Sequence, residues 1–526
     1  MSTVWSKTAP GPILPARMSG RSMALYREPA DRGENAVTEI ADRQRVAPAS
    51  SMPRGADEDP RMPRLGGAEG FAAFVAGQWG EQERRAPDVP GSAAACGAHR
   101  ARLSEALPGQ VIIVAGGRAP ARVNDCYYDF RPHSDFVWLT GCNAEDAVLV
   151  MTPTGAGHDA VLFLPVPFLP GEEGFYADVV RGELWVGPSP GLPDWEQALD
   201  LPVRDLAELD STLRGVPQAL VTGHRDRPPA LDRREDSAVL ERVLSELRMI
   251  KDGWEIAQLR QAVDATVLGF RQTVLEIPTA IRSGGERWLQ GTFDRAARSY
   301  GNGPGYATIV GSGHHASTLH WVRADGPVLP DELLLLDMGV EADSHYTADV
   351  TRTFPTSGRF TDVQRRVHDL VERSHRAGLA AVRPGRRYGD FFEACMEVIA
   401  QGLFDWGLLT VSVDEALSPR GQQHRRWLVC GIGHHLGLDV HDCSRASYDA
   451  YQGAELQPGV VMTVEPGLYF HASDLAVPPE LRGLGVRLED DVLVTATGAD
   501  VLSEALPIDA SGIEAWMRAP LPDPSA

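Results

Sequence analysis

The chain contains the run Leu333-Leu-Leu-Leu-Asp-Met-Gly339 and, a short turn later, the run Tyr346-Thr-Ala-Asp-Val-Thr-Arg-Thr-Phe-Pro355. Both runs are apolar and strand-like, each carries one carboxylate, and a hairpin between them would set Asp337 beside Asp349. Because burying an unpaired carboxylate costs on the order of several kcal/mol, the pair indicates a bound cation. On this segment alone, a solvated strand edge or a salt bridge is an equally good explanation.

A second segment, Cys430-Gly-Ile-Gly-His-His-Leu-Gly-Leu-Asp-Val-His-Asp442, brings three imidazoles into a glycine-rich stretch. Glycine lets the backbone approach a site closely, and a neutral imidazole is a common metal ligand. A lone histidine in such a stretch is more often a satisfied core residue, but the cluster of His434, His435 and His441 favours a ligand among them. We expect His435 to be the core residue.

The run Val460-Val-Met-Thr-Val-Glu-Pro-Gly-Leu-Tyr469 is a third apolar strand, and it stops at an acid. Pro-Gly directly after Glu465 ends strand pairing, so we expect Glu465 to lie at a strand end, as Asp337 does. A further acid in such a position again indicates a cation, for the same reason of burial cost.

The run Gly485-Val-Arg-Leu-Glu-Asp-Asp-Val-Leu-Val-Thr495 alternates as a strand does. Arg487, Glu489 and Asp491 therefore share one face, with Arg487 next to Glu489. Neighbouring acids such as Asp490 and Asp491 are most often an exposed, solvated pair, and we expect this here.

The rest of the sequence predicts an α+β fold in more than one domain. With 526 residues the chain exceeds what one core usually holds. Long helices are expected over 237–277 and after N-caps at Thr361 and Asp390, with strands over 333–340, 345–354, 460–465 and 485–495. Earlier strand-like runs over 111–114, 147–151 and 160–164 alternate with helical stretches, as in a smaller α/β domain.

These patterns divide the chain into four parts. Residues 1–66 are rich in Pro, Gly, Ser, Arg and Met without sustained periodicity, which predicts a disordered tail. Residues 67–236 form the smaller α/β domain, residues 237–510 form the larger α+β domain, and residues 511–526 form a C-terminal tail.

The composition excludes several classes of protein. Lys and Arg number 50 against 72 Asp and Glu, a net charge of −22 that would repel nucleic-acid phosphates. The six cysteines form no C-x-x-C pair, as expected of free thiols in a reducing compartment. No run approaches the ~20 apolar residues of a membrane span, and the N-terminus lacks the apolar stretch of a signal peptide. We expect a cytoplasmic protein with no nucleic-acid or membrane partner.

The order Asp, Asp, His, Glu, Glu along these strands resembles the pita-bread metallopeptidases, which include methionine aminopeptidase, Xaa-Pro aminopeptidase (aminopeptidase P) and prolidase. The similarity is closest to Xaa-Pro aminopeptidases, spans about residues 100–507, and implies a C-terminal pita-bread catalytic domain. His133-Ser-Asp-Phe-Val-Trp-Leu-Thr-Gly141 is similar to the family's non-catalytic domain, which implies a smaller creatinase/prolidase-type α/β domain at the N-terminus. The phrases that carry the resemblance are Asp349-Val-Thr-Arg-Thr-Phe-Pro355, His434-His-Leu-Gly-Leu-Asp-Val-His-Asp442, Thr463-Val-Glu-Pro-Gly-Leu-Tyr469 and Arg487-Leu-Glu-Asp-Asp491.

The resemblance implies a dinuclear metal site. Its five ligands would be Asp337, Asp349, His434, Glu465 and Glu489, with Asp349 and Glu489 bridging the ions. Four of the five are hard oxygen donors, which favours Mn²⁺, with Co²⁺ or Zn²⁺ as alternatives. Two such ions would share a hydroxide as nucleophile and polarise the scissile carbonyl.

Further residues gain roles from the same resemblance. Glu465 would also move a proton to the leaving nitrogen, while His320 and His441 would hold the carbonyl oxygen or the developing gem-diolate. Arg487 would orient the ligand Glu489. Tyr469, His320 and Arg487 would wall the pocket for the proline ring.

Two positions depart from the family pattern. Asp337 and Asp349 are 12 residues apart, one more than is commonest, so we expect a bulge over 342–344 to absorb the extra residue. Cys430 stands where most relatives have a histidine that touches the proline side of the substrate. We place Cys430 in the substrate site and not as a nucleophile, since no separate general base is indicated for it.

The predicted activity is hydrolysis of the Xaa-Pro bond, with release of the first residue from peptides that have proline in second position. Prolidase, which cleaves only Xaa-Pro dipeptides, is the alternative enzyme, and a metal-free pita-bread binding scaffold is the alternative from another class. Such scaffolds usually lack several ligands, whereas all five positions are filled here. The resemblance also implies a homodimer or homotetramer, with the phrase around Asp135 and Trp138 near a neighbour's active site.

Overall fold

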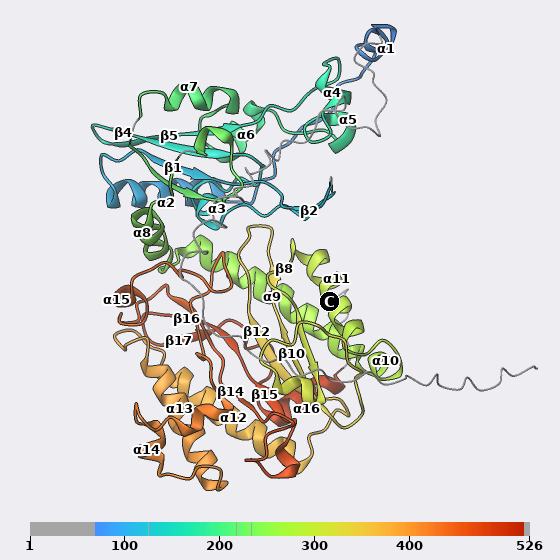
Figure 1. The fold of residues 1–526 in the computed structure, drawn as a ribbon, viewed down its shortest axis with the longest axis vertical. Helices are drawn as coiled ribbons and strands as arrows, with labels where there is room; N and C mark the ends of the chain where they lie inside the picture. The colour runs from blue at the N-terminus through green and yellow to red at the C-terminus, as the bar shows by residue number, and fades with distance from the viewer. Residues whose placement is uncertain (1–68, 125, 217, 233, 520–526) are drawn as a thin grey trace, which may run out of the picture. The chain divides into compact units, whose positions relative to one another are not determined.

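The computed structural model describes residues 69–519 apart from 125, 217 and 233 (Figure 1). The predicted tail over residues 1–66 lies outside these residues. All described residues belong to one compact unit of the chain. Among them, no helix is both long enough and apolar enough to cross a membrane.

The N-terminal lobe is built on a mixed five-stranded sheet with the order β6-β5-β4-β1-β7. Strand β1 pairs antiparallel with β4 and parallel with β7, and β5 pairs parallel with β6. The predicted smaller α/β domain is confirmed. The strands are β1 (Ile112–Ala115), β4 (Val148–Thr154), β5 (Gly157–Leu164), β6 (Val203–Asp205) and β7 (Leu220–Gly223), and the helices are α2 (Ser92–Ala106), α3 (Ser134–Thr140), α6 (Leu192–Leu199) and α7 (Leu209–Leu213).

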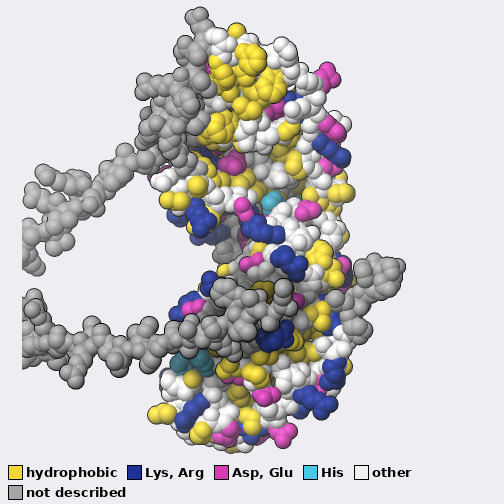
Figure 2. Space-filling model, turned by 90° about the vertical axis from the view of Figure 1, so that its right-hand side faces the viewer, with side chains coloured by type: hydrophobic (Ala, Val, Ile, Leu, Met, Phe, Trp, Pro, Cys, Tyr) yellow, Lys and Arg dark blue, Asp and Glu magenta, His cyan; other side chains and the backbone are white. Residues whose placement is uncertain are grey.

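A peripheral part of this lobe exposes large hydrophobic side chains. Leu184, Trp185 and Val186 are 53%, 46% and 51% exposed. Figure 2 shows hydrophobic side chains gathered near the top of the face that carries the short peripheral helices. This part comprises α1 (Glu69–Val75), β2 (Ala121–Val123), β3 (Cys126–Tyr127), α4 (Gly174–Ala177) and α5 (Glu183–Val186).

Two helices join the lobes, and they are the long helices that the apolar periodicity predicts over 237–277. Helix α8 spans Ala238–Arg248 and α9 spans Gly253–Leu275. Asp252 caps α9, and Glu255 completes a capping box with it. The turn between the two helices is therefore well defined, and Lys251 within it is buried.

The C-terminal lobe places antiparallel strands between two groups of helices (Figure 1). Helices α9 and α11 (Gly285–Tyr300) lie on one side, with α12 (Asp362–Ala381) and α13 (Asp390–Asp405) on the other. Thr361 caps α12 as predicted, whereas Asp390 is the first residue of α13 and not its cap. The predicted grouping of helices against antiparallel strands is confirmed.

The strands of this lobe form the sheets β12-β10-β9, β13-β16-β17, β14-β15 and β11-β8. Their bounds are β8 (Gly303–Pro304), β9 (Ile309–Ser312), β10 (Leu333–Met338), β11 (Val340–Glu341), β12 (Val350–Pro355), β13 (Val461–Val464), β14 (Gly467–Tyr469), β15 (Gly485–Arg487), β16 (Asp490–Val494) and β17 (Ala499–Val501). Four shorter helices complete the lobe: α10 (Ile277–Arg282), α14 (Val413–Leu417), α15 (Tyr448–Tyr451) and α16 (Ala510–Arg518).

The hairpin of β10 and β12 forms as predicted and keeps one register along both strands. Asp337 pairs directly with Thr351, so Asp349 lies diagonally opposite Asp337 on the same face. The two carboxylates therefore converge without any slip in the ladder.

The turn of this hairpin absorbs the extra residue. Ala342 N–H donates to Tyr346 O at 2.9 Å, and His345 adopts a left-handed φ of 67°. A left-handed residue at the end of a three-residue turn is a common way to close a hairpin. The irregularity thus lies at His345, one residue beyond the bulge predicted over 342–344.

Two other segments differ from the sequence prediction. The run over 485–495 is not one strand, because β15 ends at Arg487 and β16 begins at Asp490 in a different sheet. Residues 511–518 belong to α16, whose Ile513 is fully buried in the main core. Helix α16 is therefore part of the C-terminal lobe and not of a tail.

Candidate metal centre

Asp337 lies near the end of β10, where its buried carboxylate meets two donors. Arg487 Nη2 donates to Oδ2, and the Tyr306 hydroxyl donates to Oδ1 at 2.6 Å. Arg487, from β15, also donates through Nε to Thr351 Oγ1 at 3.0 Å. One cation thus neutralises Asp337 and ties β15 to the hairpin.

His434 and Glu465 come together because the histidine-rich segment lies along β13. Thr463 N–H donates to His434 O at 2.9 Å, and Glu465 N–H donates to Ile432 O at 2.9 Å. His434 Nε2 consequently lies 3.3 Å from Asp349 Oδ2 and 3.6 Å from Glu465 Oε1.

Glu489 reaches the same cluster from the connection between β15 and β16. An isolated β-bridge pairs it with Thr351, whose hydroxyl donates to Glu489 Oε2 at 2.5 Å. Asp349, His434 and Glu489 each offer a ligand atom within 4.8 Å of the others. Asp337 and Glu465 interact electrostatically with this trio, so the five predicted ligands lie in one cluster.

Burial of the cluster, and then the repulsion between its carboxylates, shifts the proton equilibria of its members. Burial raises the pKa of Glu465 to about 7, against the opposing attraction of His434 and Arg487. Burial, followed by repulsion from Asp349 and Glu465, raises the pKa of Glu489 well above its ordinary range. Burial alone would lower the pKa of His434, but the hydrogen bond with Asp349 and the charge of Glu465 raise it to about 9.

This donor set fits divalent cations. Asp491 Oδ2 accepts a hydrogen bond from Asp349 N–H at 3.1 Å, while Asp491 Oδ1 is buried without a hydrogen-bond partner among the described residues. Several buried carboxylates with one imidazole are the ligands that hard and borderline divalent ions prefer. Bound cations would offset the burial cost, and the smaller repulsion between carboxylates, that raise the carboxyl pKa values.

The two predicted substrate histidines lie at the edge of this cluster. His441 packs edge-on against His434, with ring centroids 4.4 Å apart, and is exposed. His320 is exposed on the loop after β9, and the preceding carbonyl, Leu319 O, accepts a hydrogen bond from Arg487 at 3.2 Å.

Tyr469 and Cys430, the other two residues predicted for the substrate site, both lie near Arg487 and Glu465. Arg487 Nη1 donates to the Tyr469 hydroxyl at 2.9 Å. Cys430 is half-buried, and burial, followed by the charge of Glu465, raises the pKa of its thiol. A protonated thiol is a poor nucleophile, which agrees with the prediction that Cys430 does not attack the substrate.

Some contacts differ from those expected. Arg487 does not bond Glu489 directly, because the break between β15 and β16 separates them; the connection runs through the Thr351 hydroxyl. His435 is the core residue that we predicted, 1% exposed and stacked on Tyr388 with ring centroids 5.3 Å apart. It is not a satisfied one, because neither of its ring nitrogens has a hydrogen-bond partner among the described residues.

The expectation of an exposed acidic pair at Asp490 and Asp491 is wrong, since both are buried. Asp490 pairs with Arg352 at 2.5 Å, and His375 Nε2 lies 3.2 Å from the other oxygen of the same carboxylate. Asp491 instead faces the hairpin backbone at Asp349. Two adjacent acids therefore serve opposite sides of β16.

The sequence prediction also missed Tyr306 and Thr351 as partners of the predicted ligands. Thr351 lies two residues after Asp349 in a strand, so the period of two already placed it on the ligand face. Tyr306 follows a glycine-rich turn without periodicity, and no local pattern distinguished it.

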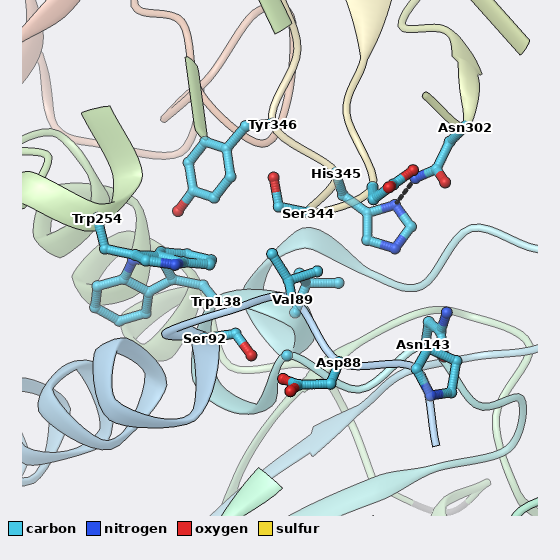
Figure 3. A pocket seen from close by; sticks show the side chains of 14 residues that line it. Asp88, Val89, Ser92, Trp138, Asn143, Trp254, Asn302, Ser344, His345 and Tyr346 are labelled. Atoms are coloured by element: carbon cyan, nitrogen blue, oxygen red, sulfur yellow. Dashed lines mark hydrogen bonds between the residues drawn. The ribbon is translucent and has the colours of Figure 1, made fainter. Parts of the chain in front are cut away.

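A separate cavity of about 320 Å³ lies at the turn of the hairpin (Figure 3). Its lining includes Trp138 of α3, Trp254 of α9, and Tyr346 of the turn. Asn302 and His345 hydrogen-bond there at 3.2 Å. No predicted ligand or substrate residue lines this cavity.

Two family models match the chain. The model of metallopeptidase family M24 matches residues 257–496, and the model of the aminopeptidase P N-terminal domain matches residues 97–220. The first covers the strands that hold the candidate metal centre, and the second covers most of the five-stranded sheet. Fold and site together define a two-domain metallopeptidase with a pita-bread catalytic domain, and hence a hydrolytic enzyme.

Full-length relatives narrow this class. Xaa-Pro aminopeptidase 2 of Streptomyces coelicolor is 44% identical over 453 residues, which cover 85% of this chain and 96% of the relative. The Xaa-Pro aminopeptidase of Escherichia coli is 32% identical over 80% of this chain and 96% of its own. The chain belongs to the Xaa-Pro aminopeptidase family.

Solved structures agree with this assignment. The low pH form of aminopeptidase P from E. coli matches with a TM-score of 0.71 at 29% identity, over 81% of this chain and 98% of that chain. Proline aminopeptidase P II from Yersinia pestis matches with a TM-score of 0.70 at 29% identity, over 81% and 99%. The structural similarity thus extends over both lobes.

Proposed function

We propose that this chain is a metal-dependent aminopeptidase that cleaves the Xaa-Pro bond and releases the first residue of peptides with proline in second position. The observation that carries the proposal is the convergence of Asp349, His434 and Glu489, in a chain whose full-length relatives are Xaa-Pro aminopeptidases. E. coli aminopeptidase P, 28% identical with a TM-score of 0.71, has been solved with the inhibitor Pro-Leu. That complex supports a site for proline-containing peptides.

Two divalent ions would be held by five side chains: Asp337, Asp349, His434, Glu465 and Glu489. Four carboxylates among five ligands favour Mn²⁺ as the native metal. When bound, such ions supply a nucleophilic hydroxide near neutral pH and polarise the scissile carbonyl. The bonds of Arg487 to Asp337 and of Thr351 to Glu489 support these ligands from behind.

Three side chains at the edge of the cluster would handle protons and developing charge. The Glu465 side chain is 18% exposed, so it can take a proton from the attacking water and pass it to the proline nitrogen. His320 and His441 are exposed, and each can donate an N–H to the carbonyl oxygen as that oxygen gains negative charge.

Prolidase is the alternative enzyme, and the contacts of Arg487 argue against it. A dipeptidase must capture the free carboxylate that directly follows proline, typically with an arginine available for paired hydrogen bonds. The guanidinium of Arg487 already donates to Asp337, Thr351 and Tyr469. An arginine bound in this way supports a site whose exit beyond proline stays open to a longer peptide.

Competition between an Xaa-Pro-Xaa tripeptide and an Xaa-Pro dipeptide, at equal concentration with Mn²⁺ present, tests this proposal. We expect release of the first residue from the tripeptide. Exclusive cleavage of the dipeptide would establish prolidase, and cleavage of neither peptide would overturn the proposed function. Glu465→Gln, which keeps the side-chain shape, is the matched inactive control.

We further propose a homo-oligomer in the cytoplasm. The exposed side chains of Leu184, Trp185 and Val186 support a protein contact on the N-terminal lobe. Asp135 and Trp138, which the resemblance implied near a neighbour's active site, are buried within their own chain. The six free cysteines support a reducing compartment.

A further inference from the structure

A cluster of opposite charges, buried except at Asp439, joins α3 of the N-terminal lobe to the histidine-rich segment. Arg248, at the end of α8, donates through Nη1 to Asp135 Oδ1 at 2.7 Å and through Nη2 to Asp439 Oδ2 at 3.0 Å and to Asp442 Oδ1. Lys251 Nζ donates to the other oxygen of Asp442 at 2.9 Å. Arg248, Lys251 and Asp442 are 4%, 4% and 1% exposed. These five residues, Asp135, Arg248, Lys251, Asp439 and Asp442, are called the ion cluster.

The ion cluster holds the base of the loop over residues 434–442, called the histidine loop. Asp442 N–H donates to His435 O at 2.9 Å, which closes the loop on itself. A Cβ at Gly437 would lie 2.1 Å from Asp442 Oδ2, so the carboxylate packs directly on the loop backbone. His441 is the residue next to Asp442 and packs on His434. Because Asp442 is held in place, the backbone position of its neighbour His441 is held as well.

The N-terminal lobe reaches the histidine loop through three neighbouring residues. Asp135 receives the bond from Arg248, and the Ser134 hydroxyl donates to Asp439 Oδ1 at 2.5 Å. Arg131 donates to Leu438 O within the loop, and its Nε donates at 2.6 Å to Glu341 of the hairpin that carries Asp337 and Asp349. The beginning of α3 thus contacts both segments that build the metal centre.

Stability is a weak explanation for this arrangement. Removing a buried ion pair from water offsets much of its attraction, and well-packed apolar side chains often serve stability equally well. Charge-assisted hydrogen bonds are directional, however, and two cations from separate positions hold both oxygens of Asp442. The ion cluster is therefore better suited to orienting the histidine loop than to stabilising the fold.

We infer that Arg248 is a positioning residue for His441, acting through Asp442, and that the N-terminal lobe shares in this positioning through Asp135. The inference rests on the proposed function, in which His441 donates to the carbonyl oxygen as charge develops. A small displacement of such a donor weakens transition-state binding more than substrate binding. Loss of Arg248 geometry should consequently lower kcat with little change in KM.

The test compares Mn²⁺-loaded full-length variants on an Xaa-Pro-Xaa peptide. Arg248→Lys keeps the positive charge but loses the branched guanidinium. Asp135→Asn keeps the side-chain shape but removes the negative charge that the N-terminal lobe contributes. His441→Ala removes the positioned imidazole. Each of the first two is also combined with His441→Ala. Arg260→Lys is the matched control, because Arg260 pairs with Asp500 at 2.5 Å with both side chains more than 40% exposed. kcat, KM and bound metal are measured for all.

Arg248→Lys is expected to lower kcat by about 10- to 100-fold with KM and bound metal unchanged, the cost of a displaced catalytic group. In the His441→Ala background the same substitution should cost less than about twofold, because coupled residues are not additive. Asp135→Asn leaves the bonds of Arg248 to the loop in place, so it should lower kcat by a smaller factor, again only when His441 is present. If Arg248→Lys does not fold, the comparison of Asp135→Asn in the two backgrounds is the test.

Equal losses in both backgrounds, or a loss confined to KM or to bound metal, would overturn the positioning role. Full kcat in His441→Ala would overturn it as well, while leaving the aminopeptidase activity in place. A wild-type enzyme that cleaves no Xaa-Pro-Xaa peptide would overturn the proposed function itself, so the two failures are distinguishable.

Discussion

In the metal-free protein, Glu465→Gln should raise stability at pH 8 while it abolishes activity in the metal-loaded enzyme. Glu465 is largely buried among acids, and its pKa rises from an ordinary 4.5 to about 7. At about 1.4 kcal/mol for each pH unit, keeping this group ionised in the folded state costs about 3 kcal/mol above pH 7. Glutamine keeps the shape without the charge and avoids this cost.

The stability advantage of Glu465→Gln over the wild type depends on pH but keeps its sign. A carboxyl whose pKa is raised on folding destabilises the folded state above the folded pKa, and the cost disappears as pH falls below the unfolded value of 4.5. The advantage of the variant should therefore shrink from about 3 kcal/mol at pH 8 to less than about 1 kcal/mol at pH 5. Added Mn²⁺ should reverse the ranking, because binding stabilises the wild type more than the variant.

Urea unfolding of chelator-treated protein at pH 8 and pH 5, followed by tryptophan fluorescence, measures these differences. Glu504→Gln, at an exposed acid of the same lobe, is the matched control and should change neither value. Two results would refute the assignment of Glu465 to a repulsive metal-binding cluster. The metal-free variant could be less stable than the wild type at pH 8, or its gain in unfolding free energy over the wild type could be the same at both pH values.

Three further outcomes are expected. Chelation should abolish peptide hydrolysis and Mn²⁺ should restore it; full activity in protein shown by elemental analysis to lack metal would contradict the metal centre. Arg352→Met should lower the free energy of unfolding, measured by urea denaturation, by about 3 to 5 kcal/mol, because it leaves Asp490 buried without its arginine. Arg260→Met, at an exposed ion pair, is the control, and an equal change in the two variants would contradict the buried pair. Light scattering should show a homo-oligomer that Trp185→Glu dissociates, whereas a fully active wild-type monomer would contradict the assembly.

The clustering of acids at the candidate metal centre could be predicted from the sequence because each acid conflicts with its surroundings. Asp337, Asp349 and Glu465 interrupt or end apolar strands, and burial of an acid demands a nearby cation wherever the strand finally lies. The hairpin brings two of them together through local pairing alone, so chain proximity was sufficient. The partners that complete the site are different in kind. Tyr306 and Thr351 are uncharged, and nothing in their local pattern conflicts with an ordinary turn or strand.

The ion cluster shows the same limit for charged residues. Arg248 and Lys251 lie in a helix end and a turn, where solvated cations are common, and helical periodicity cannot distinguish them from surface residues. Their burial follows from the approach of α3 and the histidine loop, which are more than 100 residues away in the chain on either side. Such contacts depend on the packing of the lobes and are not encoded in the local sequence pattern.

Asp490 and Asp491 indicate how the sequence argument could be extended. Strand β16 is the middle strand of β13-β16-β17, and every residue of it is buried. In a strand covered on both faces, alternation no longer separates core from solvent, so neighbouring acids point into two different interiors. Each then needs its own source of positive charge: Arg352 supplies it to Asp490, and the proposed metal centre lies on the side of Asp491. Adjacent acids with apolar residues on both sides, as in Leu488 to Val492, should therefore suggest two opposed cationic sites before they suggest an exposed pair.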